Sequence, residues 1–195
     1  MLKCAAKKKE RGIFKIKMRT LLFITLFLVT SMEAQTVFNF SKNAQLNNWY
    51  VVDDGVMGGR SKGSIRQDQE GHVVFAGQIS LKNNGGFSSL RYRLPEPIST
   101  QGVTQVVLKI KADGKDYQFR VTDQIGKRYS YITTFTTNGS WQEIAIPLNS
   151  LYPSFRGRKL NMPNFSGTVL QEITFLIGNK KEEDFELLID SITLR

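Results

Sequence analysis

The chain has 195 residues, of which 41% are hydrophobic, and this is enough for one domain with its own core. Its formal net charge of +10 would suit an anionic partner, but much of the excess lies before residue 35. The 161 residues from position 35 onward hold 19 basic and 15 acidic side chains, interspersed along the chain, for a net charge of +4. Nucleic-acid-binding domains usually carry a clustered basic face, so the composition argues against that class.

Residues 1–34 have the pattern of a secretory signal peptide. Basic side chains up to Arg19 precede the apolar run 21–28, which only Thr25 interrupts. This run is far shorter than the roughly 20 residues that a membrane-spanning helix needs. We therefore expect cleavage near Ala34, no stable membrane anchor, and an exported protein, periplasmic or extracellular. A start at Met18 would give a signal of more ordinary length and make 1–17 an upstream extension; a membrane-surface helix is the alternative.

The single cysteine, Cys4, lies in this leader, so a mature domain of residues 35–195 can form neither a disulfide nor a catalytic thiolate. Its apolar residues come in short runs separated by Gly, Asn and Asp, which is typical of strands and turns. Strands are predicted at 37–40, 49–53, 72–80, 87–94, 105–112, 117–122, 129–136, 141–148, 173–178 and 185–194.

Alternation within these runs predicts how they pack. Val106, Leu108 and Ile110 alternate with Lys109 and Lys111, and a period of two gives a strand one buried and one wet face. We therefore expect two antiparallel sheets packed face to face, an all-β sandwich with few helical residues.

The turns and aromatic residues add further expectations. The turn sequences at 83–86, 112–116 and 137–140 combine Gly with Asn or Asp and suit hairpins. The stretch 149–168 has no clear period and is expected to be an irregular loop. Strand aromatics usually pack between sheets, although exposed rings could stack on sugars. The aromatics expected in the core are Trp49, Tyr50, Tyr129, Tyr131 and Trp141.

Three segments, 53–63, 81–91 and 154–160, combine Gly with Arg, Asp and Asn in a way that indicates more than generic loops. In the first, Gly58 and Gly59 permit a tight turn that an Asp–Arg ion pair could hold. We expect the three segments to converge at one end or along one face of the sandwich, forming a positive rim for carboxylate-bearing partners; the alternative is that they are structural turns. The candidate binding residues are Asp54, Arg60, Ser61, Asn83, Asn84, Arg156 and Arg158.

Catalytic chemistry finds little support. His72 is the only histidine, which excludes a His-dependent triad or a multi-His zinc site. Asp53 and Asp54 are adjacent, so on a strand they would point to opposite faces. No pair of carboxyls suited to glycoside hydrolysis can be named. No catalytic residue, cofactor or metal ligand set is predicted.

Five sequence blocks occur in the order seen in one known family. They are DGVMGGRS at 54–61, an FxG at 75–77, NNGGFSSLR at 83–91, WQEIAIP at 141–147 and FRG at 155–157. On these blocks the chain resembles the complex I intermediate-associated protein 30 family over about residues 37 to 192. The resemblance implies a galactose-binding-like jelly-roll sandwich in a non-enzymatic, chaperone-like protein, because the best-known members are mitochondrial assembly factors. The export signal departs from those members. A protein client bound through loops and one sheet face is the first expectation, and a secreted carbohydrate-binding module is the alternative.

Overall fold

The computed structural model describes residues 34–40 and 45–195. In these ranges the chain forms β-strands joined by loops and short 3-10 turns, and none of the helical turns is long and apolar enough to cross a membrane. The first strands are β1 (Gln35–Asn39), β2 (Trp49–Asp53), β3 (Lys62–Gln67), β4 (Val73–Ile79), β5 (Ser88–Ser99) and β6 (Gln105–Ala112). The others are β7 (Asp116–Thr122), β8 (Ser130–Thr136), β9 (Gln142–Pro147), β10 (Tyr152–Phe155), β11 (Arg158–Lys159), β12 (Val169–Ile177) and β13 (Glu183–Leu194). The 3-10 turns are η1 (Asp54–Met57), η2 (Lys82–Asn84) and η3 (Leu148–Ser150).

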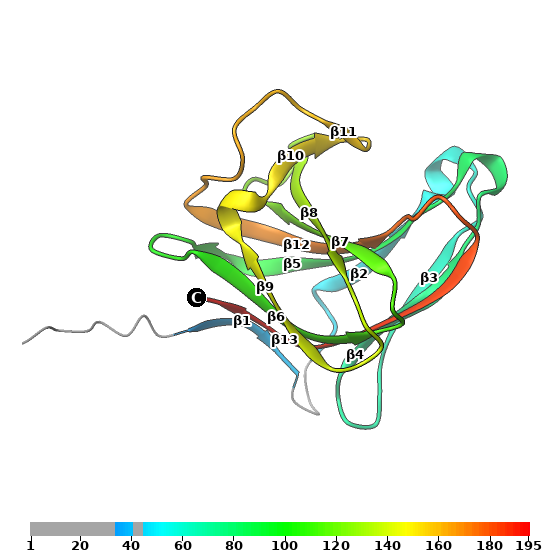
Figure 1. The fold of residues 1–195 in the computed structure, drawn as a ribbon, viewed down its shortest axis with the longest axis horizontal. Coiled ribbons are helices and arrows are strands. Elements are labelled where there is room, and N and C mark those ends of the chain that lie inside the picture. Colours follow the sequence, from blue (N-terminus) through cyan, green and yellow to red (C-terminus); the bar gives the residue numbers. More distant parts are fainter. Residues whose placement is uncertain (1–33, 41–44) are drawn as a thin grey trace, which may run out of the picture. The chain divides into compact units, whose positions relative to one another are not determined.

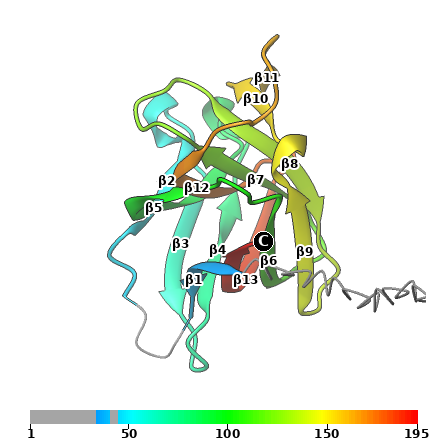
Figure 2. The same cartoon turned by 90° about the vertical axis from the view of Figure 1, so that its left-hand side faces the viewer.

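Two antiparallel sheets make up the sandwich. A six-stranded sheet has the order β3-β4-β13-β6-β9, and β1 pairs with the end of β13. A seven-stranded sheet has the order β11-β10-β8-β7-β12-β5-β2. Figure 1 shows the two layers, with β5 and β12 of the larger sheet above β6 and β13 of the smaller one, and Figure 2 shows them from the side. The prediction of an all-β sandwich is confirmed.

The core fills the space between the sheets with one side-chain parity from each strand. Phe75 on β4 and Tyr117, Phe119 and Phe175 on the larger sheet are fully buried. Val106, Leu108 and Ile110 face inward as their alternation predicted, and each is 0% exposed. Fully burying a large apolar side chain contributes about 1.5–3 kcal/mol, so the core rests on packing of the kind that the sequence required.

All ten predicted strands are present, and three more were missed. β3 carries one large apolar residue, Ile65, because it is an edge strand with little to bury. The other two, β10 and β11, lie within the stretch expected to be an irregular loop, and β10 includes Pro153, which usually argues against a strand. β10 and β11 form the other sheet's edge, where a proline is tolerated.

The expected hairpins at 83–86, 112–116 and 137–140 are wrong. Each of these turns carries the chain from one sheet to the other, since β4, β6 and β9 belong to the smaller sheet and β5, β7 and β8 to the larger. Phe87 precedes β5 and is only partly buried, so it does not start that strand on its buried face. Corners between sheets and hairpins both need residues that tolerate positive φ, as Asn83 and Gly114 do here, so the sequence could not separate them.

The expected burial of the aromatics holds for some positions and fails for others. Trp49 is 5% exposed and stacks on Tyr92 at 4.6 Å between ring centroids. Trp141 is 39% exposed and lies against His72 instead. It shares the parity of Glu143 and Ala145, whereas Ile144 and Ile146 face the core. Alternation along this run therefore places Trp141 outside, and the expectation that it is buried is wrong.

Candidate functional site

The first two special segments meet around the carboxylate of Asp54. Asp54 is 5% exposed and accepts hydrogen bonds from the backbone N–H and hydroxyl of Ser61 and from the backbone N–H groups of Gly86 (2.6 Å) and Phe87 (3.3 Å). Gly59 lies against the same carboxylate, and a Cβ there would collide with it. The expected Asp–Arg staple is wrong: four donors from three residues hold this turn, and no arginine takes part.

These contacts determine how Asp54 titrates. Burial alone would raise the pKa of Asp54, but the hydrogen bonds from Ser61, Gly86 and Phe87 outweigh burial and bring the pKa below its ordinary value. Asp54 is therefore a charged structural anchor, with its carboxylate engaged by four hydrogen bonds.

The remaining residues of these two segments surround the anchor. Ser61 also accepts the backbone N–H of Ser80 at 3.0 Å, and the amide of Asn83 donates to the Gly58 carbonyl at 2.9 Å. Asn84 has a positive φ of 58° and is exposed. We call the unit formed by 54–61 and 81–87 the Asp54 platform. Its outer surface carries Val56, which is 92% exposed, and Arg60, which makes no hydrogen bond or ion pair to any described residue.

The third special segment does not join the other two. Arg156 and Arg158 lie at the β10–β11 hairpin, where Arg156 and Gly157 take positive φ values of 49° and 75°. This hairpin is the opposite edge of the larger sheet from β2, which leads into the Asp54 platform (Figure 1). Arg156 lies over the ring of Phe155 at 5.3 Å. Among the described residues, no hydrogen bond or ion pair connects the hairpin to the platform, so the expected three-segment rim is not formed.

The structure instead gathers polar residues on the outer face of the seven-stranded sheet, the face turned away from the core. One row crosses six strands in register, because each of its members is paired directly with the next. The row runs Tyr50, Arg91, Thr174, Arg120, Ile132, Tyr152. It places a tyrosine toward each edge of the sheet and one arginine on each side of Thr174. We call it the arginine row.

A neighbouring row adds a carboxylate. Glu172, 6% exposed, accepts the hydroxyl of Tyr50 at 2.6 Å, and its oxygens lie 3.5 Å from Arg93 Nη2 and 3.9 Å from Arg91 Nη1. Burial, and then the hydrogen bond to Glu172, raises the pKa of Tyr50, so this phenol stays protonated at neutral pH. Tyr50 was expected in the core, but it has the opposite parity from Trp49 and lies on the outer face.

Arg120 has a different environment from its neighbours. It donates from Nε (3.2 Å) and Nη2 (2.6 Å) to the side-chain oxygen of Gln118, a neutral group. No carboxylate in the described ranges pairs with it. Burial, followed by the charge of Arg91, lowers the pKa of Arg120 to about 10. At neutral pH it is a cation, largely removed from water, without a counter-ion.

The sequence already indicated part of the arginine row. The alternation in 117–122 places Gln118 and Arg120 on the wet face of that strand, and Arg91 lies within one of the special segments. What the sequence lacks is the strand order, which sets β5, β12, β7 and β8 side by side although they span residues 88–177.

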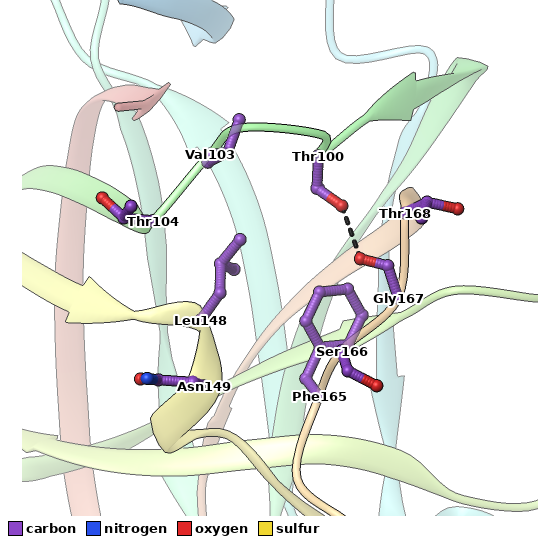
Figure 3. Close-up of a pocket in the computed structure, with 9 residues that line it drawn as sticks. All are labelled: Thr100, Val103, Thr104, Leu148, Asn149, Phe165, Ser166, Gly167 and Thr168. Atoms are coloured by element: carbon purple, nitrogen blue, oxygen red, sulfur yellow. Dashed lines mark hydrogen bonds between the residues drawn. The ribbon is translucent and has the colours of Figure 1, made fainter.

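A separate cavity of about 420 Å³ opens at one end of the sandwich. Figure 3 shows the apolar side chains of Leu148 and Phe165 among several hydroxyl-bearing residues, and Thr100 donates to the Gly167 carbonyl at 2.7 Å at one side of the cavity. The lining residues are Thr100, Val103, Thr104, Leu148, Asn149, Phe165, Ser166, Gly167 and Thr168. None of them is charged, so this cavity offers no strong electrostatic recognition.

His72 has a structural role. Its Nδ1 lies 2.9 Å from Asp68, and Nε2 lies 3.5 Å from Asp190. Asp68 and Glu70 come close enough to His72 to resemble a metal-binding trio. However, Asp68 already accepts the backbone N–H groups of Glu70 and His72 in the β3–β4 turn. We therefore assign no metal to this group.

The fold defines the class of protein: a jelly-roll β-sandwich of the galactose-binding-like type found in carbohydrate-binding modules. The structure is similar to a family 11 carbohydrate-binding module from Clostridium thermocellum in complex with a β-1,3-1,4-mixed-linked tetrasaccharide, with a TM-score of 0.59, 19% identity and coverage of 83% of this chain and 94% of the module. It is also similar to part of an exo-β-agarase, with a TM-score of 0.54, 14% identity and coverage of 83% of this chain and 25% of the enzyme chain.

The sequence identifies the family. The chain belongs to the complex I intermediate-associated protein 30 (CIA30) family, whose model matches residues 38–189. A mouse (Mus musculus) relative, complex I intermediate-associated protein 30, mitochondrial, is 24% identical over 185 residues, covering 82% of this chain and 56% of the mouse protein. The chain thus spans about half the length of that relative.

Proposed function

We propose that this chain is a non-enzymatic binding protein that holds a glycan on the outer face of its seven-stranded sheet. The observation that carries the proposal is the arginine row, in which polar side chains lie between Tyr50 and Tyr152. Aromatic faces stack on sugar rings, while arginine, threonine and glutamine side chains hydrogen-bond sugar hydroxyls. The fold likeness to a module bound to a tetrasaccharide supports this choice.

The arrangement of carboxylates favours binding over hydrolysis. Glycoside hydrolysis needs two carboxyl groups across the scissile bond, about 5 to 10 Å apart. Glu172 is the only acidic residue among those aligned with Tyr50 and Arg93, and its oxygens are engaged by Tyr50 and the two arginines. Asp53 accepts the Gly63 N–H and the Ser88 hydroxyl, so it too serves the fold.

A glycan array probed with residues 35–195 tests this function, followed by titration of the best glycan against Tyr50→Ala and Tyr152→Ala. We expect each variant to bind about 10-fold or more weakly, by analogy with the roughly 1–3 kcal/mol that stacking of a nucleic-acid base on an aromatic ring contributes. Arg66→Ala, on the edge of the other sheet, is the control and should bind normally. The proposal would be contradicted if the domain bound no glycan on the array, or if both tyrosine variants bound the glycan with normal affinity.

A protein client is the second candidate, and the Asp54 platform favours it. Val56 is 92% exposed on a turn held by buried hydrogen bonds, and Arg60 of the same platform makes no hydrogen bond or ion pair to any described residue. The mouse relative is named for its association with complex I intermediates. If a client binds here, Val56→Asp should abolish its capture from a periplasmic extract, whereas Ile125→Asp, at another exposed apolar position, should not.

We also infer that the protein works after export, in the periplasm or outside the cell. The support is the charge and apolar length of the first 34 residues, as argued from the sequence. A glycan ligand would be met in those compartments.

A further inference from the structure

The outer face carries more positive charge than its own acids neutralise. Arg91, Arg93 and Arg120 lie on it, against the single buried carboxylate of Glu172. Arg91 and Arg93 both approach that carboxylate, at 3.9 and 3.5 Å. Among the residues that the structure describes, no acid pairs with Arg120. Lys159, over the ring of Tyr152 at 5.2 Å, adds another cation at the far edge.

Arg91 and Arg120 are placed to act together. Both are paired with Thr174, one from each side, so two strand spacings, about 10 Å, separate their backbones. Long guanidinium side chains can close that gap above a small threonine. The charge of Arg91 disfavours the charged form of Arg120, and a buried cation without a counter-ion is costly. In addition, Arg91 Nε is buried and has no hydrogen-bond partner in residues 34–40 and 45–195.

An anion between the two guanidiniums would give Arg120 a counter-ion and Arg91 a hydrogen-bond acceptor. The planar guanidinium fork matches a carboxylate with two parallel, charge-assisted hydrogen bonds. We propose that the outer face binds an acidic polysaccharide, with a uronate carboxylate held between Arg91 and Arg120 above Thr174 and flanking sugar rings against Tyr50 and Tyr152. This inference rests on the proposed glycan function and names its ligand class.

Two features favour a glycan over an acidic peptide. The strands β5, β12, β7 and β8 are paired on both sides, so this face offers side chains and no free backbone for strand addition, a common mode of peptide recognition. The tyrosines at the ends of the row are five strand spacings apart, roughly 24 Å along the sheet. That distance suits a chain of several sugar rings.

The test compares oligogalacturonate, oligomannuronate and oligoglucuronate with their carboxyl-reduced counterparts by calorimetric titration at low salt. We expect at least one acidic oligosaccharide to bind about 10-fold or more tightly than its reduced form. Arg120→Met should remove this difference, while Arg66→Met, the same change on the other sheet, should preserve it. The Tm of Arg120→Met should equal or exceed that of the unmodified protein, because a buried unpaired charge has been removed.

Three outcomes would overturn the inference. If the acidic and reduced oligosaccharides bind equally well, and the tyrosine variants bind both more weakly, the glycan function stands and the acidic ligand is rejected. Binding of no glycan would reject both. A fall in the Tm of Arg120→Met, with the preference for acidic glycans unchanged in the folded fraction, would show that Arg120 serves the fold alone.

Discussion

Asp54 illustrates how one side chain in this protein determines the geometry of two loops. Three backbone N–H groups and one hydroxyl converge on its carboxylate from residues 61, 86 and 87. An asparagine has one acceptor oxygen, so in Asp54→Asn some of these donors would face an amide N–H₂. Hydrogen bonds to charged groups contribute about 1.5–3 kcal/mol each. We expect Asp54→Asn to lower the free energy of unfolding by about 3 kcal/mol in urea titrations, and the exposed Arg60→Ala to change it by less than about 0.5 kcal/mol.

The same carboxylate makes stability depend on pH. The pKa of Asp54 is lower in the folded chain than the unfolded value of about 3.9, so its contribution is present above that value and is lost as the pH falls through the folded pKa. When the urea titrations are repeated between pH 7 and pH 3, the free energy of unfolding should therefore fall less steeply with pH in Asp54→Asn than in the unmodified protein. Parallel declines would contradict the assignment of Asp54 as a charged anchor.

The two tryptophans provide a second comparison at this scale. Trp49 is packed among Phe38 and Tyr92 in the core, whereas Trp141 has one face against His72 and 39% of its surface exposed. Trp49→Ala should lower the free energy of unfolding by about 3–5 kcal/mol. For Trp141→Ala we expect no more than about 1.5 kcal/mol, the upper value for one aromatic pair. If both variants lose the same free energy of unfolding, in thermal or urea experiments, the exposure of a tryptophan does not determine its contribution to stability in this protein.

Among the elements, β3 depends on a close approach between backbones. Gly77 on β4 pairs with Gly63 on β3, and a Cβ at Gly77 would collide with the carbonyl oxygen of Lys62. Gly77→Ala must therefore push β3 away from β4, and we expect a loss of about 1–3 kcal/mol, with faster hydrogen exchange in 62–67. Gly55→Ala, where a Cβ meets open space, is the matched control. Slow exchange throughout β3 in Gly77→Ala would contradict this explanation.

At this scale the sequence predicted what depends on burial and missed what does not. Strands with one apolar face, such as Tyr117–Val121, were found because alternation records burial. The strand Lys62–Gln67 was missed because its pairing depends on Gly63 and Gly77, which carry no apolar signal. The turn at 83–86 was assigned to a hairpin because positive φ at Asn83 and Asn84 suits a sheet-to-sheet corner equally well.

The candidate site shows the same limit. The sequence grouped Asp54, Ser61 and Asn83 correctly, because their segments are rich in Gly and polar residues. Their hydrogen bonds give them a structural role that the sequence did not reveal, and their role in binding stays a prediction. The arginine row could not be found, since it requires knowing that Arg91 and Arg120 both pair with Thr174.

For the whole molecule, the leader predicts export. Expressed in a Gram-negative host, both residues 1–195 and residues 18–195 should give the same mature protein, beginning near Gln35, in the periplasmic fraction. N-terminal sequencing and mass spectrometry check this directly. Cytosolic protein with residues 18–34 intact would contradict the prediction and remove one support for an extracellular glycan ligand.

The central claim is that the outer face of the seven-stranded sheet is where this CIA30-family protein binds its ligand. The most direct measurement is an NMR titration of the ¹⁵N-labelled domain with the tightest-binding oligosaccharide. We predict that the amides that shift lie on β2, β5, β12, β7, β8 and β10, centred on the row from Tyr50 to Tyr152, with the arginine Nε signals of Arg91 and Arg120 among the largest changes. Shifts confined to the Asp54 platform, or to the cavity beside Thr100 and Phe165, would contradict the claim.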